Sequence, residues 1–133
     1  MSEDPRKSLA LYRLSKAKER LHSSESLLAA GDYADSIGRS YYAVFTAARA
    51  VLAIKGVDSK RHSGVIALFS EHFIKTGLLP KEVYRIVTGA KAKRERAEYE
   101  DYVEFSRLEA EDQFVKAREF VRHIEEAFSG LSG

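Results

Sequence analysis

The chain has 133 residues, which is enough for one domain with a single core and too few for two. It has no cysteine, which excludes disulfides and thiolate chemistry, and no apolar run approaches the roughly 20 residues that cross a bilayer. The formal net charge of +2 is too small to indicate nucleic-acid binding by itself. Since the first residues are polar and lack the apolar core of a signal peptide, we expect a cytoplasmic protein without a membrane segment.

Apolar residues recur at three- and four-residue steps along most of the chain, while period-2 runs are missing. This pattern predicts an all-α protein whose single domain spans residues 1–133. Helices are expected over 7–30, 33–56, 62–75, from Pro80 to about residue 92, and from Ser106 to about residue 128. The links between them are short, so we expect an up-and-down helical bundle of four to five helices, with residues 93–105 left unassigned.

The helix over 33–56 is expected to be central. Gly31 and Gly56 suit the left-handed residue that follows a helix, and Asp32 suits an N-cap. Gly38 would let another helix approach closely. Arg39 interrupts the apolar surface, so it either pairs with a carboxylate or lines a cleft. The expected core face consists of Ile37, Tyr41, Val44, Phe45, Ala48, Val51 and Leu52.

Charge changes sign abruptly near residue 98. Residues 81–97 hold six basic side chains and two acidic ones, whereas residues 98–112 hold seven acidic side chains and one basic. One interpretation is that the two segments pair with each other across a turn. The other is an anion site, in which arginine forks bind phosphate oxygens and Tyr99 and Tyr102 stack on bases or donate hydrogen bonds.

The four histidines have no zinc-finger or HExxH spacing, so we expect no metal site and no cofactor. His62 is the informative one, because it follows Lys60 and Arg61 and begins a predicted helix. The free amides at such an end favour phosphate. The alternative is that His62 or Ser63 caps the helix.

Five segments in order resemble the HEPN domain (higher eukaryotes and prokaryotes nucleotide-binding), in its small stand-alone prokaryotic branch. They are RSYYAVF from Arg39, KG from Lys55, HSGVIALF from His62, FIKTGLLP from Phe73 and RERAEY from Arg94. The resemblance implies an all-α bundle that forms a homodimer and works with a small nucleotidyltransferase, often as a toxin–antitoxin pair. Many members are metal-independent RNases, in which an arginine and a histidine separated by four to six residues flank an RNA phosphate and assist attack by the 2′-OH.

This chain departs from that pattern. Tyr99 stands five residues after Arg94, and Tyr102 stands six after Arg96. A phenol with a pKa of about 10 is a poor general base compared with an imidazole of about 6.5. We therefore expect a nucleotide- or RNA-binding module that acts with a nucleotidyltransferase. The alternatives are an RNase toxin and a structural helical dimer. The catalytic candidates are Arg94, Arg96 and Tyr99, and the binding candidates are Arg39, His62, Lys91, Lys93 and Tyr102.

Overall fold

The computed structural model describes residues 4–132, and these residues form helices without a strand. The elements are α1 (Pro5–Ala29), α2 (Tyr33–Ile54), α3 (His62–Phe69), a short π-helical segment η1 (Ser70–Ile74), α4 (Lys81–Tyr99) and α5 (Arg107–Ser132). The prediction of an all-α helical bundle is confirmed. None of these helices is both long and apolar enough to cross a membrane.

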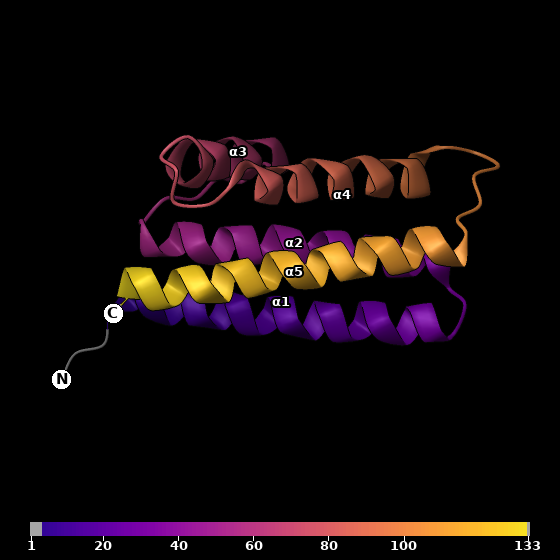
Figure 1. Cartoon of the computed structure of the whole chain (residues 1–133), viewed down its shortest axis with the longest axis horizontal. Coiled ribbons are helices and arrows are strands. Elements are labelled where there is room, and N and C mark those ends of the chain that lie inside the picture. The colour runs from indigo at the N-terminus through magenta and orange to yellow at the C-terminus, as the bar shows by residue number, and fades with distance from the viewer. Residues whose placement is uncertain (1–3, 133) are drawn as a thin grey trace.

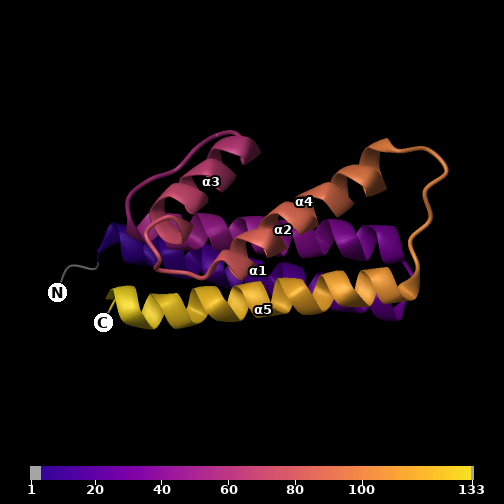
Figure 2. The same cartoon turned by 45° about the horizontal axis from the view of Figure 1, so that its top comes forward.

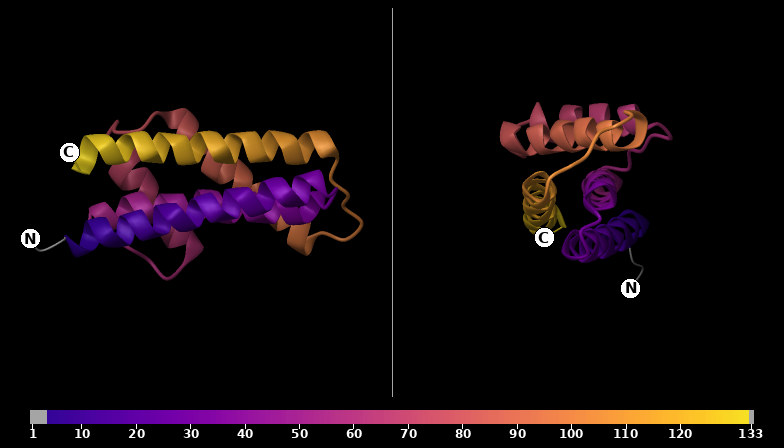
Figure 3. Two further views of the ribbon diagram at one scale, coloured as in Figure 1. Left: turned by 90° about the horizontal axis from the view of Figure 1, so that it is seen from below. Right: turned by 90° about the vertical axis from the view of Figure 1, so that its right-hand side faces the viewer.

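The bundle is built around α2. Helices α1, α2 and α5 lie lengthwise beside one another, and the chain direction alternates through α1, α2, α4 and α5 (Figure 1). Helices α3 and α4 form a second layer that crosses the others obliquely (Figure 2). Seen from the end, α2 lies between this layer and α1, with α5 alongside (Figure 3). Helix α2 accordingly contacts α1, α3, α4 and α5.

The core follows from the apolar stripes. All seven residues expected on the core face of α2 are buried. Phenylalanines join the layers, because the Phe69 ring lies 5.5 Å from that of Phe120 on α5 and 5.8 Å from that of Phe73. The second layer therefore packs on the first through aromatic rings whose burial contributes a large share of the hydrophobic free energy.

Most helix boundaries lie at the glycines and capping residues that the sequence analysis identified. Gly31 and Gly56 have φ values of +84° and +72°, which a side chain would strain. Ser106 caps α5 as predicted, since its Oγ accepts from the backbone N–H of Glu109 at 3.1 Å. The prediction for Asp32 was wrong: it occupies the N-cap position of α2, but its side chain makes no capping hydrogen bond.

Helix α4 continues beyond the predicted end, through Tyr99. The apolar period fades there, but three ion pairs at i,i+4 spacing support the helix instead. Their nitrogen–oxygen distances are 3.7 Å for Lys91–Glu95, 3.0 Å for Arg94–Glu98 and 3.7 Å for Arg96–Glu100.

Three buried serines join α1 to α2. Ser24 lies on α1, Ser36 and Ser40 lie on α2, and none of the three is exposed to solvent. The Ser24 hydroxyl lies 2.6 Å from that of Ser40 and 2.9 Å from the carbonyl oxygen of Ser36, and the Ser36 hydroxyl donates to the carbonyl of Ser24 at 2.8 Å. Each hydroxyl is thus paired where water is excluded, as buried polar groups require.

An arginine clamp holds the loop after α2. The carboxylate of Asp58 lies 2.8 Å from Nη2 of Arg49 and 3.0 Å from Nη2 of Arg13 on α1, and it also accepts from the backbone N–H of Ser59. The hydrogen bond from Arg49 is the main reason why the pKa of Asp58 falls from 3.8 to about 2, although partial burial opposes it. The clamp ties α1, α2 and the loop together.

Asp58 should make stability depend on pH. Because its folded pKa lies below its unfolded pKa, the clamp stabilises the fold fully above about pH 5 and loses that effect as pH falls towards about 2. Asp58→Asn should lower the urea midpoint at neutral pH, and the variant should lose less stability than wild type on acidification. Glu126→Gln is the matched control, since Glu126 is exposed and has no ion pair among residues 4–130. Parallel pH profiles of wild type and Asp58→Asn would contradict the role of the clamp.

Candidate functional site

Arg94 of α4 is held against α2 and is largely buried. Its side chain is only 16% exposed, and its Nη2 donates to the Tyr42 hydroxyl at 3.0 Å while Nε donates to Glu98 at 3.0 Å. The guanidinium lies 5.3 and 5.4 Å from the ring centres of Tyr41 and Tyr42, within cation–π range. Because consecutive residues on a helix point about 100° apart, the two tyrosines of α2 can flank one arginine of α4.

His62 joins the same cluster from α3. Its Nδ1 lies 2.8 Å from the Tyr41 hydroxyl, and its ring stacks on Phe45 with centres 4.0 Å apart and planes 24° apart. Burial raises the pKa of Tyr41 to about 12. Burial, followed by the positive charge of Arg94, lowers the pKa of His62. The N-cap of α3 is Arg61 and has no side-chain cap, so the predicted capping by His62 or Ser63 is not observed.

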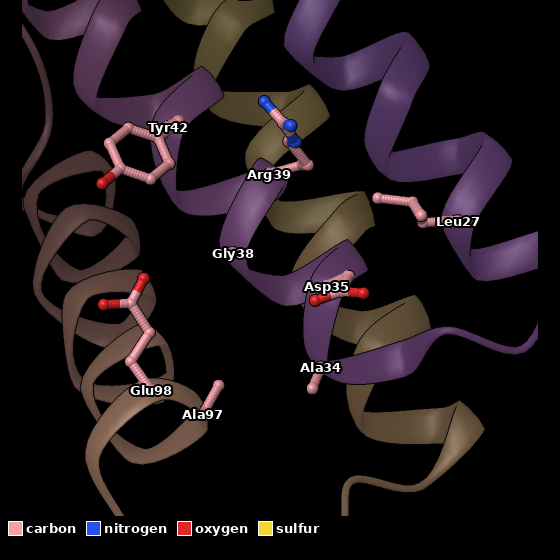
Figure 4. Close-up of a pocket in the computed structure, with 8 residues that line it drawn as sticks. All are labelled: Leu27, Ala34, Asp35, Gly38, Arg39, Tyr42, Ala97 and Glu98. Atoms are coloured by element: carbon pink, nitrogen blue, oxygen red, sulfur yellow. The ribbon is translucent and has the colours of Figure 1, made fainter.

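Arg39 lines the first of three cavities along α2. This first cavity has a volume of about 510 Å³ and lies over the surface of α2, with Leu27 of α1 on one side and Ala97 and Glu98 of α4 on the other (Figure 4). Among residues 4–130 the Arg39 side chain has no hydrogen bond or ion pair, so it is an unpaired cation in the lining of a cavity that Tyr42 also borders. The complete lining is Leu27, Ala34, Asp35, Gly38, Arg39, Tyr42, Ala97 and Glu98.

Gly38 does not serve helix packing, which corrects our prediction. A Cβ added at Gly38 would meet no atom within 4 Å. The residue borders the first cavity instead, where the missing side chain leaves room between Asp35 and Tyr42.

The first cavity continues into two others. A middle cavity of about 440 Å³ shares Arg39 with it, and a loop cavity of about 530 Å³ shares Arg49 with the middle one. The three together are called the α2 groove below. Five basic side chains line the middle cavity against one carboxylate, Glu19. Its lining is Tyr12, Arg13, Lys16, Glu19, Arg20, Ser23, Arg39, Thr46 and Arg49.

Sequence analysis missed the basic side of α1. Arg13, Lys16 and Arg20 recur at three- and four-residue steps, so they share one helix face. That spacing could have indicated a basic helix face. However, a charged stripe beside an apolar one is ordinarily just the solvent-exposed side of an amphipathic helix. Only the fold shows that this stripe borders α2 next to Arg39 and Arg49.

The other predicted cations are paired within the chain. Lys93 lies 3.3 Å from Asp112 across the turn, and Lys91 and Arg96 pair with carboxylates one helical turn further on. The interpretation of 81–97 and 98–112 as segments that pair across a turn accounts for the contact of Lys93, whereas the pairs of Lys91 and Arg96 are contacts one turn along the chain. Neither Lys91, Lys93 nor Arg96 lines the α2 groove.

Tyr99 and Tyr102 lie outside the cluster. Their exposed fractions are 71% and 104%, and neither hydroxyl has a hydrogen bond among the side chains that the structure describes. Tyr99 is five residues from Arg94, or about 140° round the helix, whereas Glu98 lies on the face of Arg94. The structure thus brings His62 and Arg94 into contact with Tyr41 and Tyr42. Arg39 lines the cavity that Tyr42 borders, whereas Tyr99 and Tyr102 lie at the end of α4.

The described residues hold no group of three or more histidine, aspartate or glutamate side chains that could bind a metal ion.

Comparison with known proteins gives a consistent result. A family model described as "HEPN domain" matches residues 10–127. A Methanocaldococcus jannaschii protein named as a putative toxin is 33% identical over 108 residues, which cover 81% of this chain and 74% of the relative. A UPF0332 protein of Thermotoga maritima is 32% identical over 90% of this chain and 91% of its own length. Another UPF0332 protein, from Pyrococcus horikoshii, is 40% identical over 56% of this chain and 53% of its own length.

Proposed function

Because the chain belongs to the HEPN domain family, we propose that it is a toxin-like module that binds single-stranded RNA or nucleotides in the α2 groove. One observation carries this proposal: the unpaired Arg39 and the aromatic ring of Tyr42 line the same open cavity. An arginine fork binds phosphate oxygens, and a tyrosine ring offers a face on which a base can stack.

The surroundings of Tyr42 support base stacking. Its hydroxyl accepts from Arg94, and the guanidinium of Arg94 also lies near the ring, so the side chain is fixed before a ligand arrives. A prearranged ring loses little conformational entropy on binding. A cavity of about 510 Å³ is within the usual size range of small-ligand sites.

The charge along the groove supports a phosphate-bearing ligand. The middle cavity continues the positive surface past Arg39. It adds Arg20 and also Lys16, whose Nζ lies 3.1 Å from the carboxylate of Glu19. A strand that neutralises several of these cations would release counterions, so its affinity should fall steeply with salt.

Arg39→Ala should weaken binding of a short single-stranded RNA at low salt by roughly tenfold, as expected for the loss of one charge-assisted hydrogen bond. Fluorescence anisotropy of labelled RNA in EDTA measures this, and repeating it over a range of salt gives the slope. Arg122→Ala is the matched control, because Arg122 is exposed on α5 and lines none of the three cavities. Equal affinities for Arg39→Ala, Arg122→Ala and wild type would refute the groove as the binding site.

A second candidate function is metal-independent RNA cleavage. The observation that favours it is at Arg94, whose Nη2 and Nε are both engaged while Nη1 has no hydrogen bond among the described residues. A fixed guanidinium with one free edge could stabilise negative charge on a phosphorane. Arg96, Tyr99 and Tyr102 complete the set of residues for this candidate.

Cleavage and binding are separated by Tyr99→Phe, which removes only a hydroxyl. If Tyr99 transfers a proton, wild type should cut RNA in EDTA, and Tyr99→Phe should bind RNA equally well but lose the activity. If the chain only binds, neither protein should cut. Gel analysis of end-labelled RNA gives the result, with Tyr84→Phe as the control for removal of a hydroxyl from a tyrosine that lines none of the three cavities. Undiminished cleavage by Tyr99→Phe would exclude Tyr99 from the chemistry.

The partners proposed are a second copy of this chain and a small nucleotidyltransferase. Relatives named as toxins suggest that a second protein restrains this one. For the homodimer, the exposed aromatic side chains Tyr99 and Tyr102 offer apolar area near the end of α4, within residues 93–102.

Sedimentation velocity at micromolar concentration should give the mass of a dimer. The double variant Tyr99→Asp with Tyr102→Asp should shift it towards monomer, because four carboxylates would face one another across a two-fold interface. Leu108→Asp is a control for charge placed on another exposed apolar residue. A wild-type protein that stays monomeric under these conditions would rule out the dimer.

A further inference from the structure

The loop cavity holds a second group of polar and basic side chains, distinct from the Arg39 that lines the first cavity. It lies between α2, the loop after α2 and the start of α3. Arg49 is committed to Asp58 there, whereas the Lys60 side chain has no ion pair among residues 4–130. Its lining is Phe45, Arg49, Asp58, Ser59, Lys60 and His62.

The hydrogen bond between Tyr41 and His62 fixes the tautomer of the imidazole. Tyr41 is 1% exposed, and with a pKa of about 12 its hydroxyl keeps its proton at neutral pH. Among the described residues the only acceptor within reach of that proton is Nδ1 of His62, at 2.8 Å. Because a buried hydroxyl left without an acceptor destabilises the fold, the O–H donates to Nδ1. A neutral imidazole that accepts at Nδ1 carries its own proton on Nε2.

The surroundings also keep His62 neutral. Burial is the main cause that lowers the pKa of His62, and the positive charges of Arg94, Arg49 and Lys91 add to it. The rings of Tyr41 and Tyr42 also face His62 from α2. Asp58 and Lys60 share the cavity from the loop. Stacking on Phe45 fixes the plane of the ring. His62 is therefore a neutral, oriented N–H donor, and no described atom accepts a hydrogen bond from its Nε2.

We propose that the loop cavity binds a phosphate ester through the Nε2–H of His62 and the ammonium group of Lys60, with Tyr41 as the positioning residue that sets the tautomer. This deepens the proposed function and rests on it, since the ester is part of the RNA or nucleotide that the α2 groove takes up. A phosphate presents several acceptor oxygens to donors that converge from different directions, which suits one N–H beside one cation.

The two cavities approach each other at Tyr42. Its ring centre lies 6.1 Å from that of His62 in the loop cavity, so one ligand can reach both the first cavity and the loop cavity. The shared chemistry is a phosphate ester, from either an RNA diester or a nucleotide monoester.

The tautomer is tested by long-range ¹H–¹⁵N NMR of histidine-labelled wild type at neutral pH. The expected His62 pattern is a protonated Nε2 and an unprotonated Nδ1. Tyr41→Phe should change it towards the usual mixture of tautomers and raise the pKa of His62. A wild-type spectrum with the proton on Nδ1, or with a charged ring at pH 7, would overturn the proposal without depending on any variant.

Ligand binding is tested on the same resonances. Adding inorganic phosphate, adenosine monophosphate or a short single-stranded RNA should shift the His62 signals. A shift with RNA alone assigns the site to a diester, and a shift with the mononucleotide assigns it to a monoester. If none of the three shifts His62, the proposal fails, whatever happens at Arg39.

Variants then separate this proposal from the proposed function. His62→Ala and Lys60→Ala should each weaken RNA binding by roughly tenfold. His62→Gln, whose amide N–H can replace Nε2–H, should stay within about threefold of wild type. Lys81→Ala is the control for an exposed lysine outside the groove. If RNA binds and Arg39→Ala weakens it while His62→Ala and Lys60→Ala do not, only this inference fails. If RNA does not bind wild type at all, the proposed function fails.

Discussion

Helix α2 can be buried only if several helices share its circumference, and the rest of the structure depends on that constraint. Its core face needs α1, α5 and the α3–α4 layer together. Four helices around a fifth still leave one strip uncovered, between α1 and α4. That strip carries Arg39, Tyr42, Thr46 and Arg49, which recur at three- and four-residue steps. The groove is thus the place where packing round α2 is incomplete, and its polar residues suit solvent.

The tyrosine pair illustrates how one sequence feature serves two layers. Tyr41 is turned towards His62 on α3, and Tyr42 towards Arg94 on α4. Burying a guanidinium costs free energy unless its N–H groups are paired, and here a phenol, a carboxylate and two ring faces compensate it. The result is a cluster in which each charged or polar group restricts its neighbour. Such prearrangement favours both RNA binding and RNA cleavage. The preference for binding comes from the chemistry of tyrosine, which is a poor general base compared with histidine.

The fold could be predicted from the sequence because apolar period, glycines and the Ser106 cap are local signals. The site could be predicted only as separate residues. Arg39, His62 and Arg94 stand out singly, but the contact between Tyr41 and His62 joins positions 21 residues apart, and no local pattern encodes it. Formal charge was misleading for Lys93, because counting cations does not reveal that Asp112 faces it. The stripe of Arg13, Lys16 and Arg20 was missed for the same reason. The sequence does not show whether a charged helix face lies open to solvent or borders a cavity next to another helix.

The buried serines of the α1–α2 hairpin also determine the alignment of the two helices. An apolar interface tolerates sliding, since one methyl group packs against another almost as well at a neighbouring position. Hydroxyls do not, because a slip of one helical turn, about 5.4 Å, would move Ser24 away from either Ser36 or Ser40 and leave part of its hydrogen-bonding capacity unmatched. The three serines therefore fix the register of α1 against α2. Arg13 and Arg49 lie on those same two helices and line the groove. The hydrogen bonds of the three serines therefore also set the distance between these charges.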